Sequence, residues 1–209
     1  MHYDIDKLIT PPKVQLPAGV KVVLASGSPR RKELCTRMGL VFEICPSTCN
    51  EDYDKTKITP REAVELLSIR KCRDVASRMG DDVLVIASDT MVEVEGEPQG
   101  KPKSHAHAKE MLEKLSGRNN VVHTGLAVSY RGQMLSSVDS TEVHFRHMTA
   151  DEILDYANSD EVMDKAGAYA VQGRGGDFIS HFDGKLDTVV GLCCEQLAEA
   201  ICKLVGDCK

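Results

Sequence analysis

The stretch that most constrains the fold lies near the start of the sequence. Residues Val22–Arg31 read VVLASGSPRR, an apolar run followed by small residues and then two arginines. The apolar run indicates a buried strand. Ser28 is a favourable helix N-cap, and Pro29 suits the first helical position. The sequence therefore predicts a strand, a tight turn and a helix in direct succession.

The two arginines do not suit the helix start that this turn predicts. Positive side chains in the first turn oppose the helix macrodipole, at a cost of roughly 0.3–1 kcal/mol each. The free N–H groups of a helix start do attract anions, and guanidinium groups add charge-assisted donors. We therefore interpret Arg30 and Arg31 as part of a phosphate-binding turn, with Ser26 and Ser28 as further donors. Two solvated arginines at a surface helix are the alternative.

The composition is that of an ordinary globular protein. The chain has 209 residues, of which 42% are hydrophobic and 28% charged. This length is enough for one large domain or two small ones, and enough to bury a real core. The net charge of −6 argues against general binding to nucleic acid or to an anionic membrane. No apolar run approaches the ~20 residues of a membrane span. The first residues lack a signal-peptide pattern, so we expect a cytoplasmic protein.

Strand and helix signals alternate early in the chain, and antiparallel pairs dominate later. This order predicts a mixed α/β (α+β) fold with helices on the faces of a mixed sheet. Residues 1–20 are expected to form an N-terminal extension and residues 21–209 a single domain. Strands are expected at 21–25, 41–45, 82–88, 91–94, 121–130, 135–145, 178–182 and 186–190, and helices at 29–38, 60–79, 104–116, 149–158 and 194–205.

Two charged residues, Asp89 and Lys71, occupy positions where the surrounding apolar pattern does not lead us to expect a charge. Asp89 directly follows the strand expected at 82–88, whose apolar run is 83–87, so we expect it at the C-terminal end of a buried strand, where open α/β sheets bind ligands. A turn-capping role is the alternative. Lys71 falls on the apolar stripe of the helix 60–79. Its ammonium either enters a site or extends to water.

Three loops supply further candidates. Lys101 stands between Gly100 and Pro102 on a constrained loop, although it could simply be solvated. Glu51 lies in an acidic loop and could hold Mg²⁺ together with Asp89, or be one of several solvated charges. Gln172 ends a small-residue stretch where a ligand could approach closely, and its amide can bind a base or sugar. A tight structural turn is the alternative there.

These candidates form a chemically coherent set. Two arginines and two lysines suit a polyphosphate, and two carboxylates suit a divalent cation and the activation of water. The sequence has neither a Walker A motif nor a GxGxxG motif. Metal-assisted hydrolysis of a phosphoanhydride is the reaction class that this set serves best.

The same residues carry a resemblance to a known family. SGSPRRKEL at 26–34, ASDTMV at 87–92, GKP at 100–102, LSG at 115–117 and DKAGAYAVQG at 164–173 resemble the motifs of the Maf family of nucleoside triphosphate pyrophosphatases. The resemblance extends over residues 21–205. It implies an inosine triphosphatase-like fold, an elongated mixed sheet with a cleft between two lobes. It also implies hydrolysis of a nucleoside triphosphate to the monophosphate and pyrophosphate, with Mg²⁺ or Mn²⁺, by a homodimer.

The resemblance also implies roles for individual residues. Asp89 matches the proton acceptor and, with Glu51, would bind the metal. The phosphate-binding positions match Arg31, Lys71 and Lys101, and the substrate-choice positions match Arg30, Thr90 and Gln172. The last three have the residue types of the branch that acts on dTTP and UTP, which we therefore favour. The alternatives are a pyrophosphatase for 7-methyl-GTP or modified purines, and a nucleotide-binding regulator of septum formation without catalysis.

Overall fold

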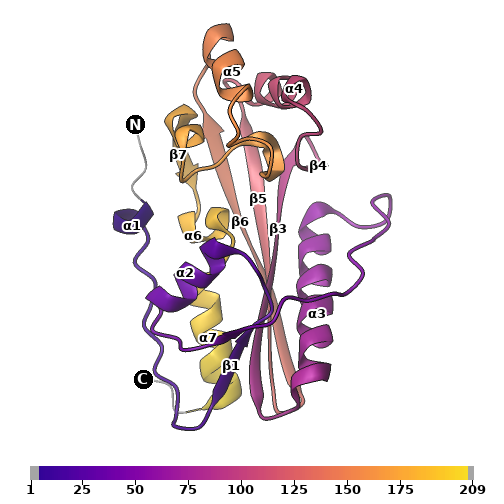
Figure 1. The fold of residues 1–209 in the computed structure, drawn as a ribbon, viewed down its shortest axis with the longest axis vertical. Helices are drawn as coiled ribbons and strands as arrows, with labels where there is room; N and C mark the ends of the chain where they lie inside the picture. Colours follow the sequence, from indigo (N-terminus) through magenta and orange to yellow (C-terminus); the bar gives the residue numbers. More distant parts are fainter. Residues whose placement is uncertain (1–4, 207–209) are drawn as a thin grey trace.

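A seven-stranded mixed sheet forms the centre of the computed structural model, which describes residues 5–206. The strand order is β2-β1-β3-β5-β6-β7, and β4 pairs with β3. Three long strands run along most of the molecule, and the short strands lie beside them (Figure 1). The expected mixed α/β fold is confirmed. The strands are β1 Lys21–Leu24, β2 Glu43–Ile44, β3 Val83–Val94, β4 Glu97–Gln99, β5 Asn119–Tyr130, β6 Gln133–Phe145 and β7 Ile179–Asp183.

The helices cover both faces of this sheet (Figure 1). Helix α3 packs against β3 and β5 on one face, and α7 packs against β5 and β6. Helices α4 and α5 lie together at the far end from α7 (Figure 1). The helices are α1 Ile5–Leu8, α2 Pro29–Arg37, α3 Pro60–Met79, α4 His105–Leu115, α5 Ala150–Ala157, α6 Leu186–Val190 and α7 Cys194–Val205, and two 3₁₀ turns span Ala166–Ala168 (η1) and Arg174–Phe178 (η2).

Strand β1 makes the sheet mixed. It pairs in parallel with β2 and with β3, and its pairing to β3 runs from Lys21 opposite Val83 to Leu24 opposite Ile86. All other neighbours are antiparallel. The alternating side chains of these strands feed two apolar clusters, a large one that includes Ile86 and a smaller one beneath α3 that includes Val85. The sheet therefore has a packed core on each face.

Local capping signals predict the helix starts well. Thr59 and Glu62 form a reciprocal capping box at the start of α3, and Thr149 and Glu152 do the same at α5. These paired bonds satisfy N–H groups that the first turn leaves free. Ser28 occupies the N-cap position of α2 as expected, but its side chain makes no capping bond. The start of α2 therefore keeps its N–H groups available.

Two expected elements are wrong. The strand expected to end at Ser88 continues to Val94, because β5 pairs with β3 throughout this region and keeps the polar residues within the ladder. Residues 186–190, expected as a strand, form α6. Their β-branched residues favour a strand, but Gly191 ends a helical turn with φ of 115° and donates its N–H to Asp187. Tertiary contacts thus override the local preference.

The N-terminal segment packs onto the sheet domain. Ile9 and Val14 are buried in the large apolar cluster, and the Val14 N–H donates to the Met38 carbonyl over 2.9 Å.

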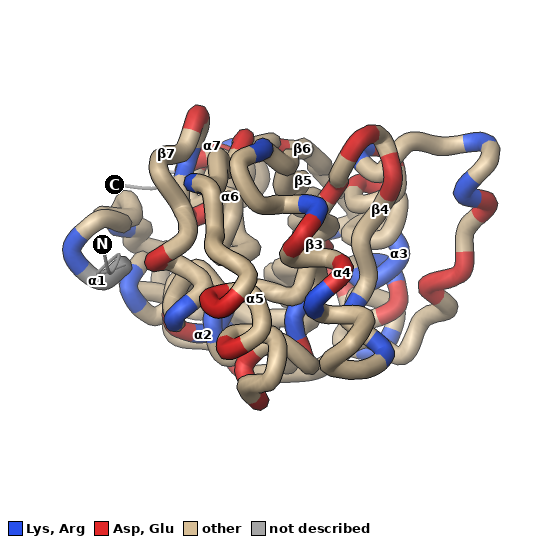
Figure 2. Tube along the Cα trace, turned by 90° about the horizontal axis from the view of Figure 1, so that it is seen from above, with Lys and Arg blue, Asp and Glu red and all other residues tan. Residues whose placement is uncertain are grey.

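Charged positions of both signs are interspersed over the view in Figure 2, and the loop that projects before α3 carries both. Within residues 5–206, no helix is both long enough and apolar enough to cross a bilayer.

Candidate active site

The candidate site straddles an open edge of β3. Strand β1 pairs with β3 as far as Ile86, and β4 begins to pair with it at Val92. Residues 88–91 lie between these two partners. Successive side chains of a strand point to opposite faces, so Asp89 and Thr90 project to different sides of the sheet. Asp89 is therefore not at the end of a strand, as its sequence position suggested, but beside a gap in the middle of one.

On the α3 face of the sheet, two carboxylates converge on one ammonium group. Lys71 Nζ lies 2.6 Å from Asp89 Oδ1 and 2.9 Å from Glu51 Oε2. The side chains of Lys71 and Asp89 are only 13% and 10% exposed, whereas that of Glu51 is 57% exposed. Burial lowers the pKa of Lys71, but attraction and hydrogen bonds from Asp89 and Glu51 outweigh it, so that the pKa is raised. The structure thus adds Lys71 to the pair of carboxylates, Glu51 and Asp89, that the sequence suggested.

The loop that carries Glu51 is held against this cluster by its neighbours. Arg70 Nη1 on α3 donates to the Asp52 carbonyl over 2.7 Å. The Tyr53 hydroxyl donates to Met91 Sδ over 3.5 Å, two residues beyond Asp89 on the same face of β3. These contacts place the exposed Glu51 carboxylate beside Asp89, although the loop itself has no regular structure.

Gly125 explains how α3 comes so close to the sheet. It pairs directly with Asp89 across the β3–β5 ladder. A Cβ atom at Gly125 would lie 2.2 Å from the Val64 carbonyl oxygen and 2.9 Å from the Glu65 nitrogen. The backbone of α3 thus rests on a position where only glycine fits, and this close packing positions the helix from which Lys71 reaches Asp89.

On the other face, Arg31 joins three parts of the chain. Its Nε donates to the Gly191 carbonyl over 2.8 Å, its Nη1 to Ser26 Oγ over 3.2 Å and its Nη2 to Thr90 Oγ1 over 3.0 Å. Burial lowers the pKa of Arg31, an effect that the nearby charge of Asp89 partly offsets. Arg31 therefore links the predicted phosphate turn to the open edge of β3.

The short helix α6 accounts for two arginines at the start of α2. Arg30 Nε donates to the Val190 carbonyl over 3.3 Å, and Arg31 donates to that of Gly191. Both acceptors lie at the C-terminal end of α6, where free carbonyl groups favour cations. The expected misfit at the α2 start is thus offset by a helix end that the sequence pattern did not predict.

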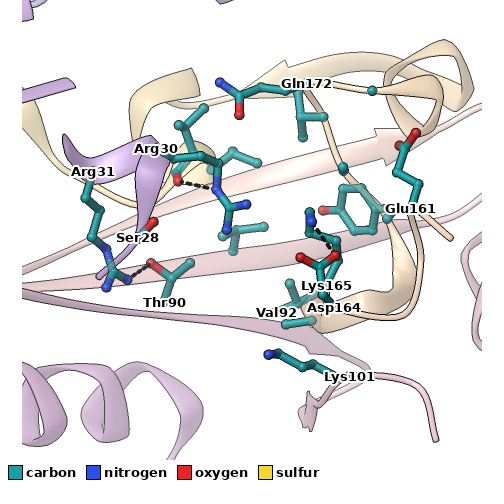
Figure 3. Close-up of a pocket in the computed structure, with 18 residues that line it drawn as sticks. Ser28, Arg30, Arg31, Thr90, Val92, Lys101, Glu161, Asp164, Lys165 and Gln172 are labelled. Atoms are coloured by element: carbon teal, nitrogen blue, oxygen red, sulfur yellow. Dashed lines mark hydrogen bonds and ion pairs between the residues drawn. The ribbon is translucent and has the colours of Figure 1, made fainter. Parts of the chain in front are cut away.

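A pocket of about 620 Å³ opens beside these arginines (Figure 3). Its volume is in the range of small-molecule sites. Val92, Val122 and Val171 contribute apolar lining. The Gly167 N–H in η1 donates to the Gly100 carbonyl over 3.2 Å, and this bond holds the loop that carries Lys101 against η1. The predicted site residues that line the pocket are Ser28, Arg30, Arg31, Thr90, Lys101 and Gln172. The lining does not include Ser26, which contacts Arg31, or the cluster of Glu51, Lys71 and Asp89.

Three further charged residues line the pocket without having been predicted. Lys165 forms an ion pair with Asp164 in the pocket wall (Figure 3). Glu161 accepts hydrogen bonds from the Tyr156 hydroxyl over 2.8 Å and from the backbone N–H of Arg174 over 3.2 Å. Glu161 thereby shapes the loop that carries Gln172. Asp164 and Lys165 begin the small-residue stretch 164–173, so the sequence could have indicated them as pocket residues. No sequence pattern indicates Glu161.

The donor set on the α3 face fits a hard divalent cation. Glu51 Oε2 and Asp89 Oδ1 contact Lys71 Nζ, and each carboxylate has a second oxygen that a cation beside this ion pair could use. Mg²⁺ is commonly bound by one or two carboxylates together with water and substrate phosphates. Within the part of the chain that the structure describes, these two residues could therefore hold a divalent cation.

The fold and the site define an α/β protein with a cationic pocket joined to a carboxylate pair across a strand edge. The chain belongs to the Maf-like protein family, whose profile matches residues 21–204. This membership confirms the resemblance noted in the sequence.

Similar proteins extend the comparison. The chain is 44% identical over 183 residues to a dTTP/UTP pyrophosphatase of Moorella thermoacetica, covering 87% of this chain and 93% of that protein. It is 40% identical over 181 residues to one of Bacillus thuringiensis subsp. konkukian, covering 87% and 94%. Among solved structures, a HAM1 protein from Coxiella burnetii aligns with a TM-score of 0.48 at 17% identity, covering 88% of this chain and 99% of that one.

Proposed function

We propose that this protein hydrolyses dTTP and UTP to the monophosphate and pyrophosphate. The relatives named dTTP/UTP pyrophosphatase cover most of the chain and support this activity. The observation that carries the proposal is the link between the two faces of β3. Arg31 joins the pocket to Thr90 and lies within electrostatic range of Asp89. A nucleotide whose base occupies the pocket can therefore extend its phosphates over the open strand edge toward Asp89.

In this reaction, Asp89 accepts a proton from the water that attacks the α-phosphorus. The bond to the bridging oxygen breaks, and pyrophosphate leaves. Lys71, Lys101 and Arg31 neutralise the charge that develops on the phosphates, and preorganised cations of this kind are a main source of catalysis. A Mg²⁺ or Mn²⁺ ion held by Glu51 and Asp89 would supply further neutralisation of the phosphate oxygens.

Substrate choice falls to Arg30, Thr90 and Gln172. All three line the pocket, and Figure 3 shows Gln172 across the pocket from Thr90. The amide of Gln172 offers both a donor and an acceptor, which matches the mixed donor and acceptor edge of uracil and thymine. Apolar side chains such as Val92 and Val171 provide the packing surface for the base and sugar.

The test is pyrophosphate release from dTTP, UTP, CTP, ITP and 7-methyl-GTP with Mg²⁺ or Mn²⁺. We expect release from dTTP and UTP, and loss of it when a chelator removes the cation. Preference for 7-methyl-GTP would instead assign the activity to modified purines. Absence of release from every nucleotide would favour a regulator that binds nucleotides without catalysis. The homodimer stays a prediction, which light scattering in solution would check.

The Asp89→Asn variant tests the general base. We expect kcat to fall about 10²–10⁴-fold, the usual contribution of a general base, with an unchanged circular dichroism spectrum. Asp82→Asn is a matched control, because the Asp82 side chain is 83% exposed and pairs only with a surface arginine among the described residues. Near-normal activity of Asp89→Asn would remove Asp89 from this role.

A further inference from the structure

The edge pair β6–β7 carries a second group of metal-binding side chains. Glu142 lies opposite Asp183, and His144 lies opposite His181. Residues two apart along a strand share a face, and directly opposed residues are cross-strand neighbours. The ladder therefore gathers two imidazoles and two carboxylates on one face of the sheet edge. None of these four residues lines the pocket or joins the Lys71 cluster.

The positions of these groups approach those of a metal site. One donor atom each from His144, His181 and Asp183 lie within 4.8 Å of one another. His144 Nε2 lies 3.3 Å from Asp183 Oδ2 and 3.7 Å from Glu142 Oε1. Tetrahedral Zn²⁺ with bonds of about 2.1 Å separates its ligand atoms by roughly 3.4 Å. To complete that geometry, the exposed Asp183 side chain has to move closer and the exposed His181 ring has to turn out of its stack on His144, because an imidazole binds a metal ion in the plane of its ring.

The buried nitrogen of His144 supplies an independent reason for a ligand. Within residues 5–206, His144 Nε2 is inaccessible to solvent and makes no hydrogen bond. The Asp183 and Glu142 carboxylates lie within ion-pair distance of this nitrogen but accept no hydrogen bond from it. A buried polar atom without a hydrogen bond is energetically costly, and bonding to a metal ion would remove that cost. The nitrogen is directed at the group, since its nearest charged atoms belong to Asp183 and Glu142.

The local backbone supports the same arrangement. The β6–β7 ladder is irregular between His144 and Phe145, and such bulges often re-aim side chains at functional positions. The two imidazole rings lie against each other, with centroids 4.0 Å apart and planes inclined by 9°, which holds both side chains at one place, although one ring has to turn before both nitrogens can bind the same ion. His181 Nδ1 lies 3.1 Å from the Ser180 hydroxyl, the kind of second contact that orients a metal-binding imidazole.

We propose that His144, His181 and Asp183 bind one divalent transition-metal ion, with Zn²⁺ as the reference ion and Glu142 available as a fourth ligand. Imidazole nitrogens favour Zn²⁺, Ni²⁺ or Cu²⁺, whereas an oxygen-only set such as Glu51 and Asp89 favours Mg²⁺ or Mn²⁺. The proposal is independent of the proposed activity. Bound metal would fasten β7 to β6, and β7 leads directly into α6, whose last carbonyl groups hold the arginines of the pocket.

The test uses the metal-free full-length protein in excess Mg²⁺, titrated with Zn²⁺ by calorimetry. We expect His181→Gln and His144→Gln each to weaken one Zn²⁺ site at least tenfold. His147→Gln is the matched control, because His147 is also exposed and follows β6 but is not part of the group. Zn²⁺ should raise the melting temperature of the wild type and of the control more than that of His181→Gln. Equal Zn²⁺ affinity in His181→Gln and the wild type would overturn the proposal.

A Co²⁺ titration distinguishes this site from the cysteines. We expect visible absorption bands without a thiolate-to-cobalt charge-transfer band, and we expect them to be lost in His181→Gln. A charge-transfer band that persists in His181→Gln would show that cysteine thiolates bind the metal, and would also overturn the assignment. His181→Gln should leave the kcat of pyrophosphate release within about twofold of the wild type in excess Mg²⁺, since the residue lies outside the pocket.

Discussion

Replacing Arg31 by methionine separates its structural role from its catalytic role. Methionine keeps most of the side-chain volume but removes the guanidinium and its three hydrogen bonds. The three acceptors do not become orphaned by this change. Each keeps a second partner, namely Ser88 Oγ at 3.0 Å for the Gly191 carbonyl, Thr124 Oγ1 at 3.0 Å for Thr90 Oγ1, and the Ser28 N–H at 3.2 Å for Ser26 Oγ.

Because the acceptors keep their partners, Arg31→Met should affect the stability of the fold less than it affects kcat/KM. Hydrogen bonds to a charged group contribute about 1.5–3 kcal/mol each, but much of their loss arises when a partner is left unsatisfied. The substitution also removes a cation whose burial is unfavourable, as its lowered pKa indicates. We therefore expect the free energy of unfolding to fall by only about 1–2 kcal/mol. Loss of one preorganised cation should reduce kcat/KM about 10²–10³-fold, equivalent to about 2.7–4 kcal/mol.

Urea unfolding and pyrophosphate release from dTTP measure these two quantities on the same preparations. Arg30→Met is the matched control, because Arg30 shares the turn but donates only to the Val190 carbonyl among the described residues. We expect Arg30→Met to change the ratio of the kcat/KM values for different nucleotides more than it changes kcat/KM for the preferred nucleotide. The reasoning is refuted if Arg31→Met keeps kcat/KM within about tenfold of the wild type, or loses more than about 3 kcal/mol of stability.

Three further predictions concern stability and reactivity. Gly125→Ala should lower the free energy of unfolding by about 3 kcal/mol, because its Cβ would meet the Val64 carbonyl; urea unfolding checks this. The pKa of Glu152 is lowered to about 2, chiefly by Arg146, so the ionised Glu152 stabilises the fold fully above pH 4.5 and this stabilisation is lost as pH falls toward 2. The difference in free energy of unfolding between the wild type and Glu152→Gln, measured by urea unfolding, should therefore shrink across that pH range. Burial raises the pKa of Cys35 to about 12, so iodoacetamide at pH 8 should label it only after unfolding, as mass spectrometry of the labelled peptide would show.

The parts of the fold that sequence could predict are those set by neighbours along the chain. Helix α3 begins and ends where its Thr59 cap and Gly80 indicate, because these residues act within one turn. The two wrong elements depend on distant partners. Strand β3 continues through Asp89 because β5 lies beside it. Distant side chains also hold the carbonyl groups of α6 and its cap, since Thr124 donates to that of Thr188, and Ser88 donates to that of Gly191. No local pattern contains that information.

The candidate site divides in the same way. Charged residues in apolar or constrained positions, such as Lys71 on its stripe and Asp89 after its run, were recognisable because they contradict their surroundings. The placement of Asp89 and Thr90 on opposite faces was not, because it requires β3 to continue through both residues, and the open edge beside them depends on where β1 and β4 pair with β3. The role of Glu161 could not be predicted from the sequence, because its carboxylate accepts hydrogen bonds from backbone N–H groups of a loop more than ten residues further along the chain.

The gap in pairing along residues 88–91 has a consequence for which molecules can react. If the base occupies the pocket as proposed, the α-phosphate has to lie at that edge to meet Asp89, and the β- and γ-phosphates extend beyond it. A monophosphate bound in the same way brings its α-phosphate to the edge but has no phosphoanhydride to break. The open edge thus leaves room for the departing pyrophosphate, which the triphosphate carries and the product does not.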